Sequence, residues 1–236
     1  MAKLYIVGTP IGNLEDITLR ALRILNQVEY IACEDTRVTH KLLEKYEIKN
    51  KKLLTYNNFT EKSSSKGLLE LIRNGNDVAL VSDAGMPVVS DPGFEVIAQA
   101  KDAGLEVEII PGVNAAITAF VGSNFSNEFT FLGFIKDKSQ QRINQLSTLE
   151  IGTYIFYVSP HKLLATLQDI DTVFQGKERV CLAKELTKIY EQWFFGSGAQ
   201  LYQEFASFDS IKGEFTMVLN IPKTKHVKVN KYKKEN

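Results

Sequence analysis

The first half of the chain alternates short apolar runs with longer stretches in which apolar residues recur every three or four positions. Four apolar runs end at turn residues, as β-strands do: 4–7, 30–33, 78–81 and 107–110. Four stretches have the spacing of amphipathic helices: 18–28, 36–46, 92–104 and 114–122. Strands that alternate with helices predict an α/β unit on a mostly parallel sheet.

The starts of three of these helices can be predicted more closely. Asp16 is expected to cap the first helix, and Thr36 or Thr39 the second. In the third, Asp91 is expected at the N-cap and Pro92 at the first helical position. The side chains of this helix expected to face the core are those of Phe94, Ile97 and Ala98.

The second half begins after a stretch of small polar residues at 123–127, which predicts a linker. The strand-like runs beyond it are 129–134, 154–158, 180–183, 193–195 and 215–221, with helix-like segments at 139–149, 161–170 and 199–205. This order predicts a second α/β domain with a mixed sheet. We therefore expect domains at 1–122 and 128–222, and a disordered basic tail at 223–236.

Composition is that of a folded, soluble protein. The 236 residues suffice for two domains of about 120 each, and hydrophobic residues make up 44% of the chain. No apolar run is long enough for a membrane span or a signal sequence, so a cytoplasmic location without a membrane partner is expected. Cys33 and Cys181 are expected to be buried, reduced thiols, and no zinc-ligand spacing occurs.

Charge is balanced overall but uneven along the chain. There are 28 basic and 28 acidic residues. The tail at 223–236 holds six lysines and one glutamate, a net charge of +5, which leaves −5 on the rest. Any nucleic-acid contact must therefore use a local basic patch. The tail is expected to aid affinity for any nucleic acid that binds, without taking part in chemistry.

Four turns that follow the predicted strands are rich in Gly, Pro, Asp and Ser: 8–13, 34–37, 81–93 and 110–116. In open parallel sheets, ligands bind beyond the carboxyl ends of the strands, so these turns form the candidate site. The first turn has glycines four apart, at Gly8 and Gly12, which is neither a dinucleotide-binding fingerprint nor a phosphate-binding loop. A plain strand-to-helix turn explains this one equally well.

The other three turns each have a chemical and a structural interpretation. The carboxylates at 34–35 beside Arg37 suit a base and its orienter, although a helix cap and solvated charges are the alternative. Asp83 follows a buried strand, and the small residues after it leave room for a ligand whose hydroxyls or cationic sulfonium it would contact. The Pro-Gly turn at 111–112 enters a helix whose N-terminus favours an anionic group.

Taken together and in this order, these segments resemble the tetrapyrrole methylase superfamily, and within it the branch of 16S ribosomal RNA cytidine-2′-O-methyltransferases. The matching stretches are TPIGNLEDITLRAL at 9–22, EDTR at 34–37, VALVSDAGMPVVSDPG at 78–93, IPGVNA at 110–115, GFIKDK at 133–138, SPHKLLATL at 159–167, KELTKIYE at 184–191 and KGEF at 212–215. They span the chain except for its tail.

The resemblance implies two α/β domains with S-adenosylmethionine in the cleft between them, and a homodimer. It implies methylation of a cytidine ribose 2′-oxygen in the decoding centre of 16S rRNA, within the small ribosomal subunit. It places the contacts with the methyl donor at Pro10, Asp83, Ala84, Gly85, Pro111, Gly112, Val113, Asn114, Ala115, Tyr157, Val158, Phe215 and Thr216.

The same resemblance places Glu34, Thr36 and Arg37 on the substrate side. Methyl transfer from a sulfonium is an in-line displacement that needs no metal, and a general base would add roughly 10²–10⁴-fold. The candidates for that base are Asp35 and Glu185. The residues expected to grip RNA phosphates are Arg37, Lys136, Lys138, Arg142 and Lys162.

The chain departs from the usual residues of this family at four places. Gly8 stands where the family usually has Ala, and Met86 where it has Thr. The stretch at 136–138 is Lys-Asp-Lys instead of Pro-Arg-Lys, and Val158 replaces a Glu. If that glutamate aids catalysis, activity is in question; an apolar residue packed against the donor is the alternative. Two other functions therefore stay open: a methyltransferase of a small molecule such as a tetrapyrrole precursor, and a non-catalytic ribosome-binding protein.

Overall fold

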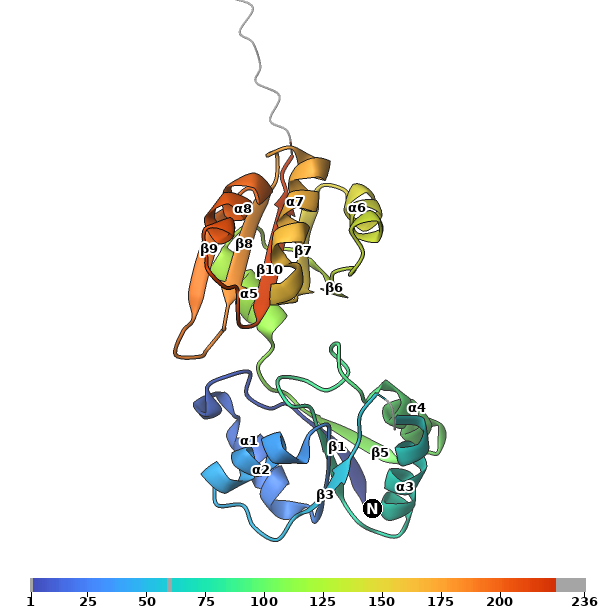
Figure 1. Ribbon diagram of the computed structural model, residues 1–236. Coiled ribbons are helices and arrows are strands. Elements are labelled where there is room, and N and C mark those ends of the chain that lie inside the picture. Colours follow the sequence, from blue (N-terminus) through green and yellow to red (C-terminus); the bar gives the residue numbers. More distant parts are fainter. Residues whose placement is uncertain (1, 59–60, 224–236) are drawn as a thin grey trace, which may run out of the picture.

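The computed structural model describes residues 2–58 and 61–223, which form two α/β units, one above the other in Figure 1. The first unit contains β1 (Lys3–Val7), β2 (Tyr30–Cys33), β3 (Lys52–Thr55), β4 (Val78–Val81) and β5 (Glu106–Ile110). These strands form one sheet in the order β3-β2-β4-β1-β5, and all neighbours are parallel. The carboxyl ends of its strands therefore lie at one edge.

Helices cover both faces of the first sheet. They are α1 (Leu19–Gln27), α2 (Thr36–Lys45), α3 (Glu61–Arg73) and α4 (Phe94–Asp102), with a short 3₁₀ turn, η1 (Leu14–Asp16), before α1. Alternate residues of the strands point to opposite faces, so each strand serves two cores. In β1, Tyr5 and Val7 pack with α1 and α2, whereas Leu4 and Ile6 pack with α3 and α4.

The second unit contains β6 (Thr130–Phe134), β7 (Gly152–Val158), β8 (Arg179–Lys184), β9 (Gln192–Gly196) and β10 (Phe215–Ile221). They form a sheet in the order β6-β7-β10-β8-β9, in which β6 and β7 are parallel and the other pairs antiparallel. The predicted fold class, two α/β domains with a parallel and a mixed sheet, is confirmed.

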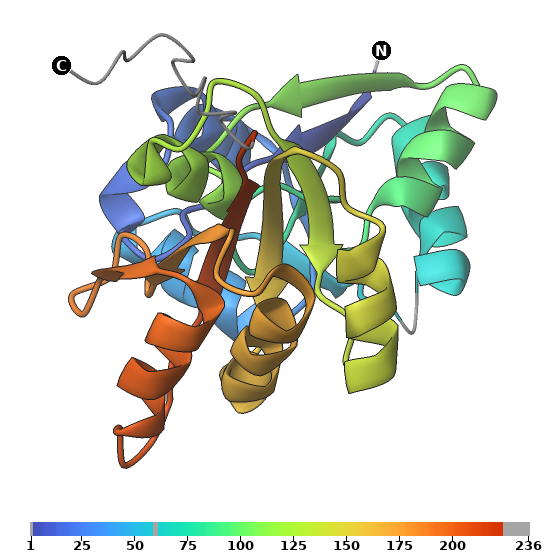
Figure 2. The same cartoon turned by 90° about the horizontal axis from the view of Figure 1, so that it is seen from above.

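Four helices of the described chain pack on the second sheet, three on one face and one on the other. On one face of its sheet lie α6 (Ser139–Ser147), α7 (Leu163–Phe174) and α8 (Gly198–Ala206), which run side by side in Figure 2. A 3₁₀ turn, η2 (Pro160–Lys162), precedes α7.

Helix α5 (Ala115–Ser123) covers the other face of the second sheet. Its buried Ala116 and Ala119 pack with Ile155, Cys181 and Val218 of the strands. The chain thus passes from the first sheet to the second at 111–114. The linker expected at 123–127 leads from α5 into β6, inside the second unit.

Two predicted helix caps are wrong, and each has a physical reason. Thr18, not Asp16, caps α1, because its side chain accepts the N–H of Ala21 at 3.1 Å. Asp35 caps α2 in the same way, where Thr36 or Thr39 was expected. The helix expected to start at 114 does so, and Asn114 is its N-cap, since its Oδ1 accepts the N–H groups of residues 116 and 117.

The start of α4 also differs from the prediction. Gly93 is the N-cap, and Glu61 of α3 supplies the carboxylate: its Oε1 accepts the N–H of Gly93 at 2.9 Å and that of Glu95 at 3.2 Å. The predicted inward face is wrong at Phe94, which is 72% exposed, whereas Ile97 packs against the core as expected, beside the buried Val96 and Ala100. With this cap supplied from another helix, Asp91 is not needed at the helix start.

Both cysteines are buried and unpaired, as expected. In the part of the chain that the structure describes, no helix has the length and apolar character required to cross a membrane. The predicted tail begins at Lys223, and its residues 224–236 lie outside the described residues.

Candidate functional site between the two sheets

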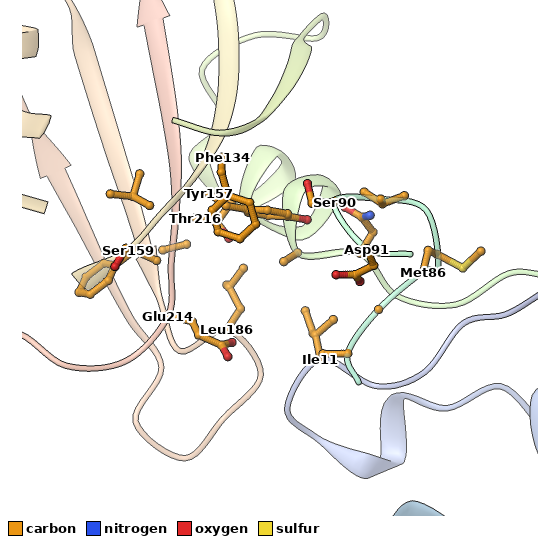
Figure 3. Close-up of a pocket in the computed structure, with 18 of the residues that line it drawn as sticks. Ile11, Met86, Ser90, Asp91, Phe134, Tyr157, Ser159, Leu186, Glu214 and Thr216 are labelled. Atoms are coloured by element: carbon orange, nitrogen blue, oxygen red, sulfur yellow. The ribbon is translucent and has the colours of Figure 1, made fainter. Parts of the chain in front are cut away.

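The carboxyl edge of the first sheet and one end of the second sheet enclose a cavity of about 400 Å³ (Figure 3). A cavity of this size suits a small molecule. The first sheet and its connections contribute Ile11, Ala84, Gly85, Met86, Val89, Ser90, Asp91, Asn114 and Ala115. The second unit contributes Phe134, Tyr157, Val158, Ser159, Pro160, Ala183, Leu186, Glu214, Phe215 and Thr216.

Gly85 lines the cavity, and backbone pairing where β1, β4 and β5 end supports this floor. The N–H of Thr9 donates to the carbonyl of Gly85 at 2.9 Å, and the N–H of Gly85 donates back at 3.1 Å. Gly85 has φ +84°, which favours glycine. Gly8 and Gly112 approach so closely that a Cβ on Gly112 would lie 2.8 Å from the Cα of Gly8. Glycine is therefore required for the three strand ends to meet.

Neighbouring strands of the second sheet provide the opposite wall. In the antiparallel pair β7 and β10, Phe215 lies opposite Val158 and Thr216 opposite Tyr157. The rings of Phe134 and Tyr157 have centroids 5.4 Å apart. This wall is largely apolar and aromatic, which suits a flat ring.

A contact between two loops joins the units beside the cavity. The N–H of Asn13, after β1, donates to Oγ1 of Thr187, between β8 and β9, at 3.0 Å. Gly12 permits this approach, because a Cβ there would lie 2.5 Å from Cγ of Lys188. Ile11 and Leu186 flank the contact and line the cavity.

Eight of the residues predicted to contact the methyl donor line this cavity: Ala84, Gly85, Asn114, Ala115, Tyr157, Val158, Phe215 and Thr216. The other five lie in or beside the same loops but outside the lining: Pro10, Asp83, Pro111, Gly112 and Val113. The structure thus brings together loops that are far apart in sequence. Contact of these residues with a donor stays a prediction.

Neither predicted base has the properties of a free base. Arg37 donates to both carboxylate oxygens of Asp35, and its N–H adds a third hydrogen bond, which together lower the pKa of Asp35 to about 2. Burial would raise the pKa of Glu185, but the N–H of Glu214 at 2.8 Å and Nζ of Lys188 at 3.0 Å outweigh it and lower this pKa. Both carboxylates therefore hold their protons weakly.

A second set of carboxyl groups lies at the ends of β2 and β4. Oδ1 of Asp83 accepts the N–H of Asp35 at 3.0 Å, and Oε1 of Glu34 accepts the N–H of Asp83 at 3.3 Å. Burial, with the nearby charge of Asp91, raises the pKa of Glu34 to about 7. Burial also raises the pKa of Asp91 to about 6. These groups can exchange protons near neutral pH.

Of the residues predicted to grip RNA, the lysines and Arg142 have different environments. Lys136, Lys138 and Lys162 are exposed. The guanidinium of Arg142 is 1% exposed, and it pairs with Asp169 at 2.6 Å. Arg142 is therefore not available to a phosphate, and that prediction is corrected.

Substrate-side residues at 34–37 lie at the first-sheet edge. Thr36 begins α2, and Arg37 is exposed.

Two departures from the family pattern lie next to each other: a Cβ on Gly8 would lie 2.6 Å from Sδ of Met86. Val158 lines the cavity and is buried in the second core. The side chain of Met86 thus occupies space that an alanine at position 8 would need.

Several lining residues were absent from the predicted site. Leu186, Glu214 and Phe134 lie in stretches that match the family, but none of them was assigned a role. Asp91 and Ser90 belong to the loop that the sequence marked as site-like, but Asp91 was interpreted as a helix cap. Among the described residues, no three His, Cys, Asp or Glu side chains are arranged to hold a metal ion.

Replacing Asp83 by alanine is expected to weaken binding of S-adenosylmethionine. Its carboxylate ties the turn at 83–85 to the start of α2 through the N–H of Asp35. Losing a hydrogen bond to a charged group costs about 1.5–3 kcal/mol, or roughly 10–150-fold in affinity. The matched variant Asp83→Asn keeps an acceptor oxygen and should retain most of the affinity. Calorimetric titration beside a melting curve tests both. Unchanged affinity would remove Asp83 from the site, and a collapsed melting temperature would make it structural.

Comparison with known proteins places this arrangement in one family. The family model described as Tetrapyrrole (Corrin/Porphyrin) Methylases matches residues 3–202. A ribosomal RNA small subunit methyltransferase I of Mycoplasmopsis pulmonis is 52% identical over 222 residues, which are 94% of this chain and 99% of that protein. Its namesake in Thermotoga maritima is 43% identical over 222 residues, 93% of this chain and 99% of that protein.

Solved structures share the fold at low sequence identity. The uroporphyrin-III-C-methyltransferase of Thermus thermophilus superposes with a TM-score of 0.68 at 20% identity, covering 93% of this chain and 94% of that one. At this identity the likeness shows the fold alone.

Proposed function

Because the chain belongs to the tetrapyrrole methylase family, within the group of ribosomal RNA small subunit methyltransferase I, we propose that it transfers a methyl group from S-adenosylmethionine to 16S rRNA. The finer proposal is that the acceptor is a cytidine ribose 2′-oxygen in the decoding centre. The observation that carries it is convergence: the turns after β1, β4 and β5 and the ends of β7 and β10 line one cavity.

The residues of the cavity fit such a donor. The N-terminus of α5, at Asn114 and Ala115, lies in the lining and favours a carboxylate. Tyr157 and Phe134 offer aromatic surface for an adenine ring.

The protein's part in catalysis is then mainly placement. When bound, the sulfonium supplies the methyl group and a good leaving group. The cavity holds it beside the loops at 34–37 and 83–91, which belong to the same edge of the first sheet. Holding donor and hydroxyl in line can contribute about 7–11 kcal/mol to lowering the barrier.

For the RNA, we propose contacts from exposed side chains of both units: Arg37 in the first, and Lys136, Lys138 and Lys162 in the second. The lysines would bind phosphates and fix the register, while the loop at 34–37 would face the target nucleotide. The predicted tail would add sequence-independent affinity.

We also propose that the protein works as a cytoplasmic homodimer. Apolar side chains on the outer face of α5 support an interface there, since Ile117 is 47% and Val121 is 70% exposed. They lie four residues apart and therefore on the same face of the helix.

The direct test is to map the product. We expect small ribosomal subunits that lack the modification to gain label from S-adenosylmethionine at a ribose 2′-oxygen of 16S rRNA. Protein-free 16S rRNA is the matched substrate for asking whether the assembled subunit is needed. Label on a base, or only on tetrapyrrole precursors, would reject the proposal. Donor and subunit binding without transfer would indicate a non-catalytic ribosome-binding protein.

A further inference from the structure

The loop between β4 and α4 presents one carboxyl group to the cavity. Asp91 lines it, and in Figure 3 its carboxylate lies between Ile11 and Tyr157. Because Glu61 takes over the capping of α4, the side chain of Asp91 has no role at that helix start. No ion pair within the described residues engages it, whereas Glu214, the other carboxylate of the lining, pairs with Lys188 at 3.0 Å.

The surroundings of Asp91 favour proton exchange. The negative charge of Asp83 opposes the ionisation of Asp91, and Ser82 lies close enough to lower its pKa. The charge of Asp91 in turn raises the pKa of Glu34. The hydroxyl of Ser82 is 2% exposed and makes no hydrogen bond of good geometry. Burial, which is the largest influence, raises the pKa of Asp91 to about 6. A carboxyl group in this range is ionised at neutral pH and can still take up a proton.

From this geometry we infer that Asp91 is the catalytic residue that accepts the proton of the ribose hydroxyl. The inference rests on the proposed function and deepens it.

Bonds and charges balance in this step. The O–H bond of the ribose hydroxyl breaks and its proton passes to a carboxylate oxygen of Asp91. The oxygen keeps the electron pair and forms the bond to the methyl carbon, while the electrons of the breaking S–CH₃ bond stay on sulfur. A sulfonium, a hydroxyl and a carboxylate become a thioether, an ether and a carboxylic acid.

Other candidates for the acceptor fit less well. Asp35 is held by Arg37, and Glu185 by Lys188 and a backbone N–H, so both have lowered pKa values. Tyr157 faces the same cavity, but burial and the charge of Asp91 raise its pKa.

The test compares Asp91→Asn with wild type by two measurements. Single-turnover transfer to small subunits should fall by roughly 10²–10⁴-fold, the usual contribution of a general base. Calorimetry should give affinities for S-adenosylmethionine and for the demethylated product within about 3-fold of wild type. A 3-fold change is small, since even a tenfold change in affinity corresponds to only about 1.4 kcal/mol. The matched control is Asp102→Asn, an exposed aspartate at the far end of α4, which should match wild type in both.

The pH dependence separates a proton acceptor from a structural residue. Asp91 must be ionised to accept a proton, so wild-type transfer should be lost as pH falls through about 6, the pKa of Asp91. The titratable groups that face Asp91 are Glu34, Asp83 and Tyr157, and Arg37 lies beside Asp83. The loss of transfer at low pH therefore reports the titration of this whole cluster. In Asp91→Asn the transfer rate should depend much less on pH in this range.

Three outcomes would overturn the inference. Full transfer by Asp91→Asn would exclude a catalytic role. A loss of sulfonium affinity much larger than the loss of affinity for the neutral product would make Asp91 a counterion of the donor instead. If wild type transfers no methyl group to small subunits, the proposed function fails and the inference falls with it; failure of the variant test alone leaves the proposed function intact.

Discussion

Replacing Arg142 by methionine is expected to lower the free energy of unfolding by about 3–5 kcal/mol, the usual cost of removing one partner from a buried ion pair. Nε and Nη2 of Arg142 lie 2.7 and 2.6 Å from Oδ2 of Asp169, and both side chains are at least nine-tenths buried. Nη1 also donates to the carbonyls of Lys136 and Asp137. The variant leaves a buried carboxylate whose remaining partner is the hydroxyl of Ser139.

Urea unfolding measures this loss. The matched control is Lys138→Met, an exposed cation at the N-cap of the same helix, which should change stability by less than about 0.5 kcal/mol. Removing both charges, in Arg142→Met with Asp169→Leu, should restore much of the stability, since apolar replacements of buried pairs are often neutral. A loss below about 1 kcal/mol in the single variant would show that the pair is not structurally important.

Replacing Gly112 by alanine is expected to weaken binding of S-adenosylmethionine at least tenfold, which corresponds to about 1.4 kcal/mol. The new Cβ would lie 2.8 Å from the Cα and 2.9 Å from the carbonyl carbon of Gly8. Backbone atoms cannot rotate away, so β1 and β5 must separate at the floor of the cavity. Overpacking of this kind usually costs about 1–3 kcal/mol.

Gly67→Ala provides the matched control for this change. Gly67 lies in α3, and among the described residues no atom other than those of its chain neighbours and its own helix backbone lies within 4 Å of the position of a Cβ. Alanine should therefore leave donor affinity unchanged and stabilise the helix by up to about 1 kcal/mol. Calorimetric titration and a melting curve of each variant give both quantities. Equal donor affinity in Gly112→Ala and wild type would show that the cavity floor tolerates the displacement.

Sequence patterns predicted those elements whose own residues determine them. The runs at 78–81 and 215–221 are β4 and β10, residue for residue, because apolar residues continue to the strand ends. The strand β3 and the helix α3 were not predicted. The first has only two apolar residues, Leu53 and Leu54. The second has three serines in a row at 63–65 and contains Gly67, which weaken helix propensity.

The site was predicted in outline because carboxyl ends of parallel strands meet at one edge. What the sequence could not provide was the identity of partners from elsewhere in the chain. Glu61 caps α4 from another helix and so frees Asp91, and Asp169 removes Arg142 from the surface. Both interactions join residues about 30 apart in sequence, and no local pattern records such a pairing.

The place of β10 in the second sheet has a consequence for the protein while it is being synthesised. It is the last strand of the described chain, yet it lies between β7 and β8 and supplies Phe215 and Thr216 to the cavity. All strands of the first sheet have left the ribosome once residue 110 has emerged. By contrast, the edges of β7 and β8 that pair with β10 stay unpaired until β10 is made. A chain released before β10 is made therefore lacks one wall of the cavity, so under the proposed function only finished molecules would compete for the methyl donor.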